Sequence, residues 1–268
     1  MIKAGEIQKI ASVQGVRDTQ IEKDYVIGWI LKGISQNGYL SEHLVFKGGT
    51  VLKKIWFSDY RFSEDIDFTF KGEGWDVKKV ETTFKEVSDW VYGESRIKLS
   101  IAPEDGTDDQ YRCYISYQGP LGGEKNIKCD ISTNELIYHA EERKAVLDNY
   151  SDVEDEYKIK SYSLEESLAE KLRCTIQRTI SRDIYDIWYL TEEAGIDIED
   201  VAFGFQAKTK HKGYDPMSII EILKSKEKKY KANWEKNLKH QINDLPEFDE
   251  IWREVMRHVK KMMELLGS

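Results

Sequence analysis

The feature that most constrains the fold is the stretch Asp65-Ile66-Asp67-Phe68-Thr69-Phe70, in which polar and apolar side chains alternate strictly. Successive side chains of a β-strand point to opposite faces of a sheet, so this alternation predicts a half-buried strand. One face would pack on a core, and the other would carry Asp65, Asp67 and Thr69. The two carboxylates would lie about 7 Å apart by strand geometry.

A pair of glycines precedes this strand, in Gly48-Gly49-Thr50, between a predicted strand and a predicted helix. Without side chains, glycines let backbone N–H groups approach a phosphate, and a helix N-terminus adds a favourable dipole. Thr50 offers a hydroxyl, and Lys47 and Lys53 offer positive charge nearby. An ordinary tight turn would use the same glycines. Together with the paired aspartates, however, the loop predicts a site for a nucleoside triphosphate.

The paired aspartates also predict a metal site. Two neighbouring carboxylates repel each other, and a divalent cation between them relieves the repulsion; hard oxygen ligands select Mg²⁺ or Mn²⁺. A third carboxylate, Asp130, ends another predicted strand and would complete a two-metal site with Asp65 and Asp67. The alternatives are an exposed polar face for the aspartate pair and a strand cap for Asp130.

The predicted elements change in kind along the chain. Up to about residue 160, predicted helices (18–37, 50–56, 76–92) mix with predicted strands (43–46, 65–70, 96–101, 111–117, 126–131), and a hairpin loop is predicted at 103–109. Beyond it every predicted element is a helix, at 163–179, 182–193, 217–234 and 247–266. We therefore predict an α+β chain of two domains, an α/β domain over 1–160 and a helical domain over 161–268.

Composition excludes several classes of protein. With 268 residues, the chain can bury a substantial core. Its longest apolar stretch, 25–31, is far shorter than the roughly 20 residues that a membrane span needs, so no membrane partner is expected. The spacing of Cys113, Cys129 and Cys174 suggests neither a disulfide framework nor a zinc site. We expect buried thiols without disulfide partners in a reducing cytoplasm.

The charge distribution is uneven. The chain as a whole carries a formal charge of −9, whereas residues 201–240 hold ten lysines and four acids, a local charge of +6. Such a basic segment can attract a phosphate backbone. A solvated, lysine-rich helix face would give the same pattern.

Two blocks of residues resemble the AbiEii/AbiGii toxin family. The first is Gly48-Gly49-Thr50 followed by Arg61-x-Ser63-x-Asp65-Ile66-Asp67-Phe68, and the second is Ser163-Leu-Glu-Glu-Ser-Leu-Ala-Glu-Lys171 followed by Arg178 and Arg182-Asp-Ile-Tyr-Asp-Ile-Trp188. The resemblance covers roughly residues 20–190. It implies a polymerase-β-like nucleotidyltransferase, with a mixed sheet and helices followed by a helical half, from the abortive-infection and type IV toxin–antitoxin systems that include the MenT toxins.

The resemblance also implies roles for residues of the second block. In the family a helical lysine and aspartate help to form the active site, which makes Lys171 and Asp186 catalytic beside Asp65 and Asp67. Asp183 lies on the same helix face as Asp186, and it is expected to contact the nucleotide. The alternative is that these charges form salt bridges between packed helices. Arg61 and Ser63 could touch phosphate or orient Asp65, and Arg61 could equally pair with a neighbouring acid.

The activity implied by the resemblance is a metal-dependent transfer of a nucleoside monophosphate from an NTP to an acceptor hydroxyl. The implied acceptor is RNA, in particular a tRNA 3′ end, so that translation stops during phage defence, and an antitoxin is the implied partner. Two alternatives stay open. The enzyme could label a protein, such as its antitoxin, or a small molecule, or the chain could be an inactive module that only binds nucleotide or a partner.

Overall fold

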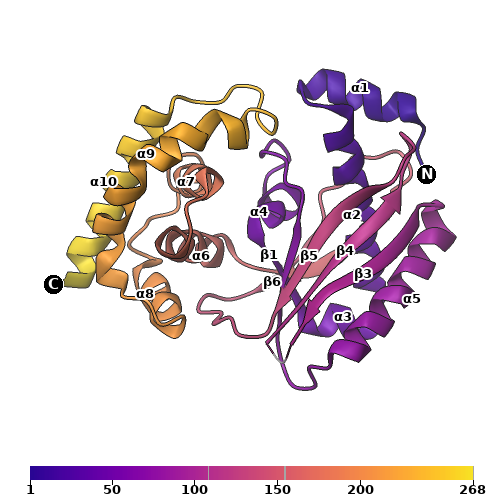
Figure 1. The fold of residues 1–268 in the computed structure, drawn as a ribbon, viewed down its shortest axis with the longest axis horizontal. Helices are drawn as coiled ribbons and strands as arrows, with labels where there is room; N and C mark the ends of the chain where they lie inside the picture. The colour runs from indigo at the N-terminus through magenta and orange to yellow at the C-terminus, as the bar shows by residue number, and fades with distance from the viewer. Residues whose placement is uncertain (108, 154, 268) are drawn as a thin grey trace. The chain divides into compact units, whose positions relative to one another are not determined.

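The computed structural model describes residues 1–107, 109–153 and 155–267. It divides into two compact units. The first, here called the α/β unit, comprises Met1–Asn134 and Glu142–Ser161; the second, the helical unit, comprises Glu135–Glu141 and Tyr162–Ser268. Figure 1 shows the elements of both.

A seven-stranded mixed sheet forms the centre of the α/β unit, in the order β3-β4-β5-β2-β1-β7-β6. β1 pairs antiparallel with β2 and parallel with β7, and β2 pairs parallel with β5; the other pairs are antiparallel. The strand bounds are Leu44–Lys47 (β1), Ile66–Phe70 (β2), Lys98–Gly106 (β3), Gln110–Gln118 (β4), Lys125–Ser132 (β5), Glu142–Ala145 (β6) and Lys158–Ser161 (β7).

The helices of this unit are α1 (Ala4–Gln14), α2 (Asp18–Gln36), α3 (Gly38–His43), α4 (Gly48–Val51), the π-helical turn η1 (Leu52–Trp56) and α5 (Val77–Ser95). Helix α5 lies along one face of the sheet (Figure 1), and its Phe84 ring is 6.4 Å from that of Tyr111 on β4. The register aligns Tyr111 with Ile131 and Phe68. The apolar side of β2 therefore belongs to this covered face.

The strand predicted from the alternation is confirmed. Ile66, Phe68 and Phe70 are buried, while Asp65 and Asp67 are half-buried. Thr69 departs from the pattern because it is also buried. The predicted hairpin loop at 103–109 is too long at its start, since β3 continues to Gly106; Asp108, within that loop, lies outside the described residues.

The helical unit contains α6 (Leu164–Gln177), α7 (Ser181–Trp188), η2 (Tyr189–Glu193), α8 (Ala202–His211), η3 (Pro216–Ser218), α9 (Ile219–Leu238) and α10 (Phe248–Gly267). Helix α10 buries a stripe that includes Ile251, Val255, Val259 and Met262, as its apolar spacing requires. None of the helices in the described part of the chain is long and apolar enough to cross a membrane. The sheet and its helices together confirm an α+β fold.

Candidate active site

The junction between β1 and α4 brings the glycine loop against the paired aspartates. Gly48 has a φ of +84°, a conformation that glycine adopts at little cost. A Cβ atom at Gly48 would also overlap the Oδ2 atom of Asp67. Both facts demand glycine here, because the backbone passes directly beside the Asp67 carboxylate.

The second glycine lies against two more of the predicted residues. A Cβ atom at Gly49 would be 2.7 Å from Nη2 of Arg61 and 3.4 Å from Oγ of Ser63. Both of these side chains are buried, and Arg61 also donates from Nη1 to the carbonyl oxygen of Phe62, at 3.2 Å. Thr50 donates its hydroxyl hydrogen bond to the carbonyl oxygen of Asp65. The structure therefore brings a guanidinium and two hydroxyls to the glycine loop.

The strand register extends this cluster across the sheet. Lys47 on β1 is paired with Asp67 on β2, Asp67 with Asp130 on β5, and Asp130 with Arg112 on β4. Directly paired residues share a face of the sheet, and adjacent strands lie about 4.8 Å apart. Asp67 and Asp130 are therefore lateral neighbours. Arg112 was not predicted from the sequence, because only the register reveals its place in this row.

Asp130 is held by two cations. Its Oδ1 accepts from Nε of Arg112 at 2.7 Å, and its Oδ2 accepts from Nζ of Lys128 at 2.6 Å. Burial lowers the pKa of Lys128, but Asp130 and, more weakly, Asp65 raise it above its ordinary value. Asp65 therefore acts electrostatically on the same patch. Because all three members of the Asp130 pairs are about one-third exposed, each pair contributes at most about 1 kcal/mol.

The donor set of this face fits a hard divalent cation. Asp65, Asp67 and Asp130 supply carboxylate oxygens, the ligands that Mg²⁺ and Mn²⁺ prefer. Among the residues that the structure describes, no group of three or more His, Cys, Asp or Glu side chains is arranged to hold a metal ion. Asp130 would have to exchange its weak pairs with Arg112 and Lys128 for a cation in order to join the two aspartates of β2.

Lys53 contacts the segment from Ser58 to Phe62. Its ammonium group donates to the carbonyl oxygen of Ser58 and lies 4.5 Å from the centre of the Phe62 ring. It lines a pocket together with Asp24 and Tyr150, and neither glycine lines that pocket. Burial lowers the pKa of Lys53.

The predicted residues of the helical unit form a cluster of their own. Nζ of Lys171 on α6 lies 2.6 Å from Oδ2 of Asp186 and 3.1 Å from Oδ1 of Asp183, both on α7. Arg178 donates to both oxygens of Asp183, at 2.8 and 2.9 Å. Burial raises the pKa of Asp183, but Lys171 and Arg178 outweigh it and hold that pKa below its usual value. The ion pairs of Lys171 therefore connect α6 with α7.

A second buried pair in this unit was missed from the sequence. Glu166 accepts hydrogen bonds from Lys208 and from the backbone N–H groups of Tyr138 and His139, and both charged side chains are inaccessible to solvent. Lys208 therefore does not belong to the basic surface that its segment suggests. The segment does expose seven lysines, at 210, 224, 228, 229, 231, 236 and 239. All three cysteines are buried, as expected, and carry free thiols.

Comparison with known proteins identifies the family of this chain. Residues 29–258 match the model of the family described as nucleotidyl transferase AbiEii toxin, type IV toxin–antitoxin system. Because the match spans most of the chain, the protein belongs to the AbiEii family of nucleotidyltransferase toxins. The predicted family and enzyme class are thereby confirmed, and membership implies an antitoxin partner.

Solved structures share the fold. The chain is similar to MenT4, a nucleotidyltransferase toxin from Mycobacterium tuberculosis H37Rv, at 16% identity and a TM-score of 0.72, over 100% of this chain and 90% of that one. It is also similar to JHP933 from Helicobacter pylori, at 18% identity and a TM-score of 0.61, over 94% and 95% of the two chains. A search of curated proteins found no match.

Proposed function

We propose that this nucleotidyltransferase moves a nucleoside monophosphate from an NTP to a hydroxyl at the 3′ end of a tRNA, with release of pyrophosphate. One observation carries the proposal: the backbone at Gly48 closes on the Asp67 carboxylate, while Arg61 and Ser63 lie against Gly49. Groups that are able to bind phosphate therefore lie beside carboxylates at one end of β1.

In this proposal each residue of the cluster has a physical task. The backbone N–H groups at Gly48 and Gly49 and the Arg61 guanidinium bind phosphate oxygens, since each is a donor that favours negative charge. Asp65, Asp67 and Asp130 hold a divalent cation, Mg²⁺ or Mn²⁺. When bound, the cation supplies charge neutralisation at the phosphates and polarises the reacting phosphorus–oxygen bonds. Lys47, paired with Asp67 on the neighbouring strand, offsets the negative charge of the aspartates.

The roles of Lys171, Asp183 and Asp186 in catalysis rest on the resemblance to the family. The proposal assigns Lys171 and Asp186 to the active site as catalytic residues and Asp183 to contact with the nucleotide. The mutual salt bridges of these three residues are the competing explanation for their presence.

RNA as the acceptor is supported by the exposed lysines of α9 and its flanks, which can attract a phosphate backbone. The proposal places the reaction in the cytoplasm, where NTPs and tRNA are both present, and makes arrest of translation the toxic outcome during phage infection. The antitoxin would relieve this arrest.

The test is an incubation of the purified protein with Mg²⁺ or Mn²⁺, each labelled NTP in turn, and total tRNA. The wild-type protein and the control Asp89→Asn, on the exposed side of α5, should label tRNA. Asp67→Asn should not label tRNA, and its circular dichroism spectrum should match that of the folded wild type. Failure of the folded wild type to transfer label from any NTP would overturn the proposal, and label on protein instead of tRNA would overturn the choice of acceptor.

A further inference from the structure

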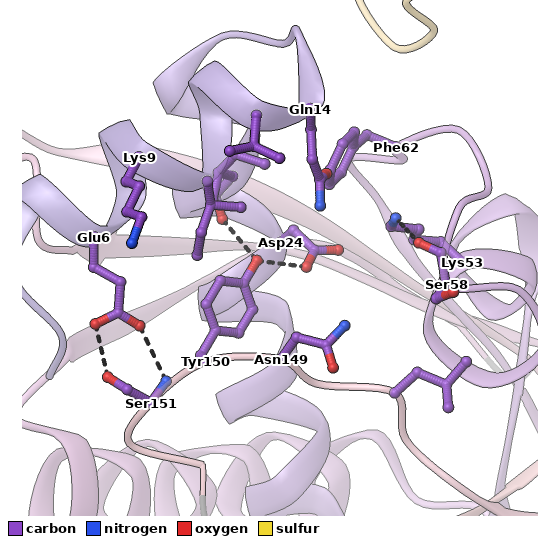
Figure 2. Close-up of a pocket in the computed structure, with 14 residues that line it drawn as sticks. Glu6, Lys9, Gln14, Asp24, Lys53, Ser58, Phe62, Asn149, Tyr150 and Ser151 are labelled. Atoms are coloured by element: carbon purple, nitrogen blue, oxygen red, sulfur yellow. Dashed lines mark hydrogen bonds between the residues drawn. The ribbon is translucent and has the colours of Figure 1, made fainter.

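The α/β unit contains a pocket of about 490 Å³ that the catalytic proposal does not use. Its walls are α1, the first half of α2, the segment from Lys53 to Phe62, and residues 147–151 (Figure 2). Pockets that bind small molecules typically measure about 300–1,000 Å³. Phe62 lies in the chain between Arg61 and Ser63, so one wall of the pocket is continuous with the residues that contact Gly49.

Part of the lining is apolar and open to solvent. Val13 is 81% exposed and Leu147 is 38% exposed, although both are large aliphatic side chains. Ile10 and Phe62 line the pocket as well. Exposed apolar side chains gathered around a concave surface mark a binding site more often than scattered ones do. The ligand should therefore present an apolar face.

The charged groups of the lining cancel. Glu6 and Asp24 face Lys9 and Lys53, which gives a formal charge of zero. Both oxygens of Glu6 accept from Ser151, and Oδ2 of Asp24 accepts from Tyr150 and from the buried Lys54. An uncharged ligand, or the uncharged part of a larger one, fits this balance better than a free anion does.

Two carboxamides complete the lining. Gln14 and Asn149 point toward the middle of the pocket (Figure 2), and neither is joined by a hydrogen bond to another residue drawn there. A carboxamide both donates and accepts, which suits the mixed donor and acceptor edges of a nucleobase. A flat, uncharged ligand with apolar faces and polar edges therefore matches both the apolar side chains and the carboxamides of the lining.

We propose that this pocket binds a nucleobase, with its edge hydrogen-bonded to Gln14 and Asn149 and its faces against Val13, Leu147 and Phe62. The inference rests on the proposed function in one respect, that the base belongs to a substrate of the transferase. The base can come from the incoming NTP or from the terminal nucleotides of the RNA acceptor, and the chemistry of recognition is the same for both.

Binding of free nucleosides tests the pocket without requiring phosphate contacts, metal or turnover. Isothermal titration calorimetry with adenosine, cytidine, guanosine and uridine should detect binding of at least one, and ribose alone should not bind. Gln14→Ala and Asn149→Ala should each weaken that binding about tenfold, the effect of losing a good contact to a base edge. The control Gln8→Ala, also exposed on α1 but outside the pocket, should bind as the wild type does.

Titration of the same variants with an NTP and with the trinucleotide CCA shows whether the bound base belongs to the incoming nucleotide or to the RNA acceptor. Weakened NTP binding assigns the pocket to the incoming nucleotide, and weakened CCA binding assigns it to the acceptor. No nucleoside binding, equal binding of ribose, or unchanged affinity in both variants would overturn the inference. Asp67→Asn should still bind nucleosides, so loss of transfer and loss of base binding are independent results.

Discussion

The two clusters of predicted site residues are built in opposite ways. In the α/β unit, Asp65, Asp67 and Asp130 are half-buried, and strand register and backbone contacts fix their positions. In the helical unit, Lys171, Asp183 and Asp186 are almost wholly buried and bind one another. The carboxylates of the first cluster are partly accessible to solvent, whereas the buried charges of the second cluster form ion pairs with one another.

This difference separates two kinds of consequence. Substitution of a half-exposed carboxylate leaves little buried charge without a partner, so it should affect stability less than it affects chemistry. A buried charge that loses its partner remains desolvated and unpaired, at a cost of about 3–5 kcal/mol. Substitutions should therefore reduce activity without unfolding in the α/β unit, and reduce stability in the helical unit.

Asp67→Asn should have the largest effect. Transfer of label from NTP should fall roughly a thousandfold or more, because the variant removes a carboxylate that is proposed to hold the divalent cation at the phosphates. The free energy of unfolding, measured in urea, should fall by less than it does in Lys171→Met, since Asp67 is only half-buried and asparagine keeps the shape of its side chain. A large loss of stability would show that Asp67 holds the fold, and the contrast between the clusters would fail.

Lys171→Met should give the next largest effect, on stability. It leaves Asp186 and Asp183 buried near a methionine in place of an ammonium group, so urea unfolding should show a loss of about 3–5 kcal/mol. Lys224→Met, on the exposed side of α9, is the control and should change stability by less than about 0.5 kcal/mol. If Lys171→Met is as stable as this control, the cluster is not a structural lock and the ligand role of Lys171 gains support.

Gly48→Ala should produce a smaller change in stability together with a loss of activity. The left-handed backbone strains any L-residue by about 1–2 kcal/mol, and the new methyl group must displace the Asp67 carboxylate. Gly74→Ala is a matched control, because Gly74 has a φ of +86° and nothing within 4 Å of its Cβ position. Transfer should survive in Gly74→Ala only; equal activity in the two variants would refute the contact between loop and aspartate.

Local patterns explain which parts were predictable from the sequence. The alternation at 65–70 identifies β2 because the period of a strand is readable within six residues. The glycine pair marks a junction where a side chain cannot fit. The structure shows that a side chain at Gly48 would clash with Asp67. Each of these signals lies within the segment that it describes.

Pairings between distant segments were not predictable. Asp67 and Asp130 become neighbours through a parallel pairing of β2 and β5, and no local spacing encodes a register across 63 positions. The sequence Ser163-Leu-Glu-Glu166 has the spacing of a helix capping box, but only half of the box forms. Ser163 accepts from the N–H of Glu166, whereas the Glu166 carboxylate binds Lys208 and two backbone N–H groups. A buried lysine with a distant partner looks in sequence like a surface lysine.

The pH dependence of stability offers the finest test of the contrast. Lys171 and Arg178 hold the pKa of Asp183 below its usual value despite burial. The folded chain therefore favours the ionised carboxylate of Asp183 more than the unfolded chain does. The resulting stability is fully present above the unfolded pKa of about 3.9 and is lost as the pH falls below it. Asp183→Asn should be less stable at pH 7, but its free energy of unfolding should fall less steeply below about pH 4 than that of the wild type. Asp244→Asn, in an exposed turn of the same unit, should keep the wild-type slope; equal slopes in all three proteins would show that Asp183 is not stabilised as a buried anion.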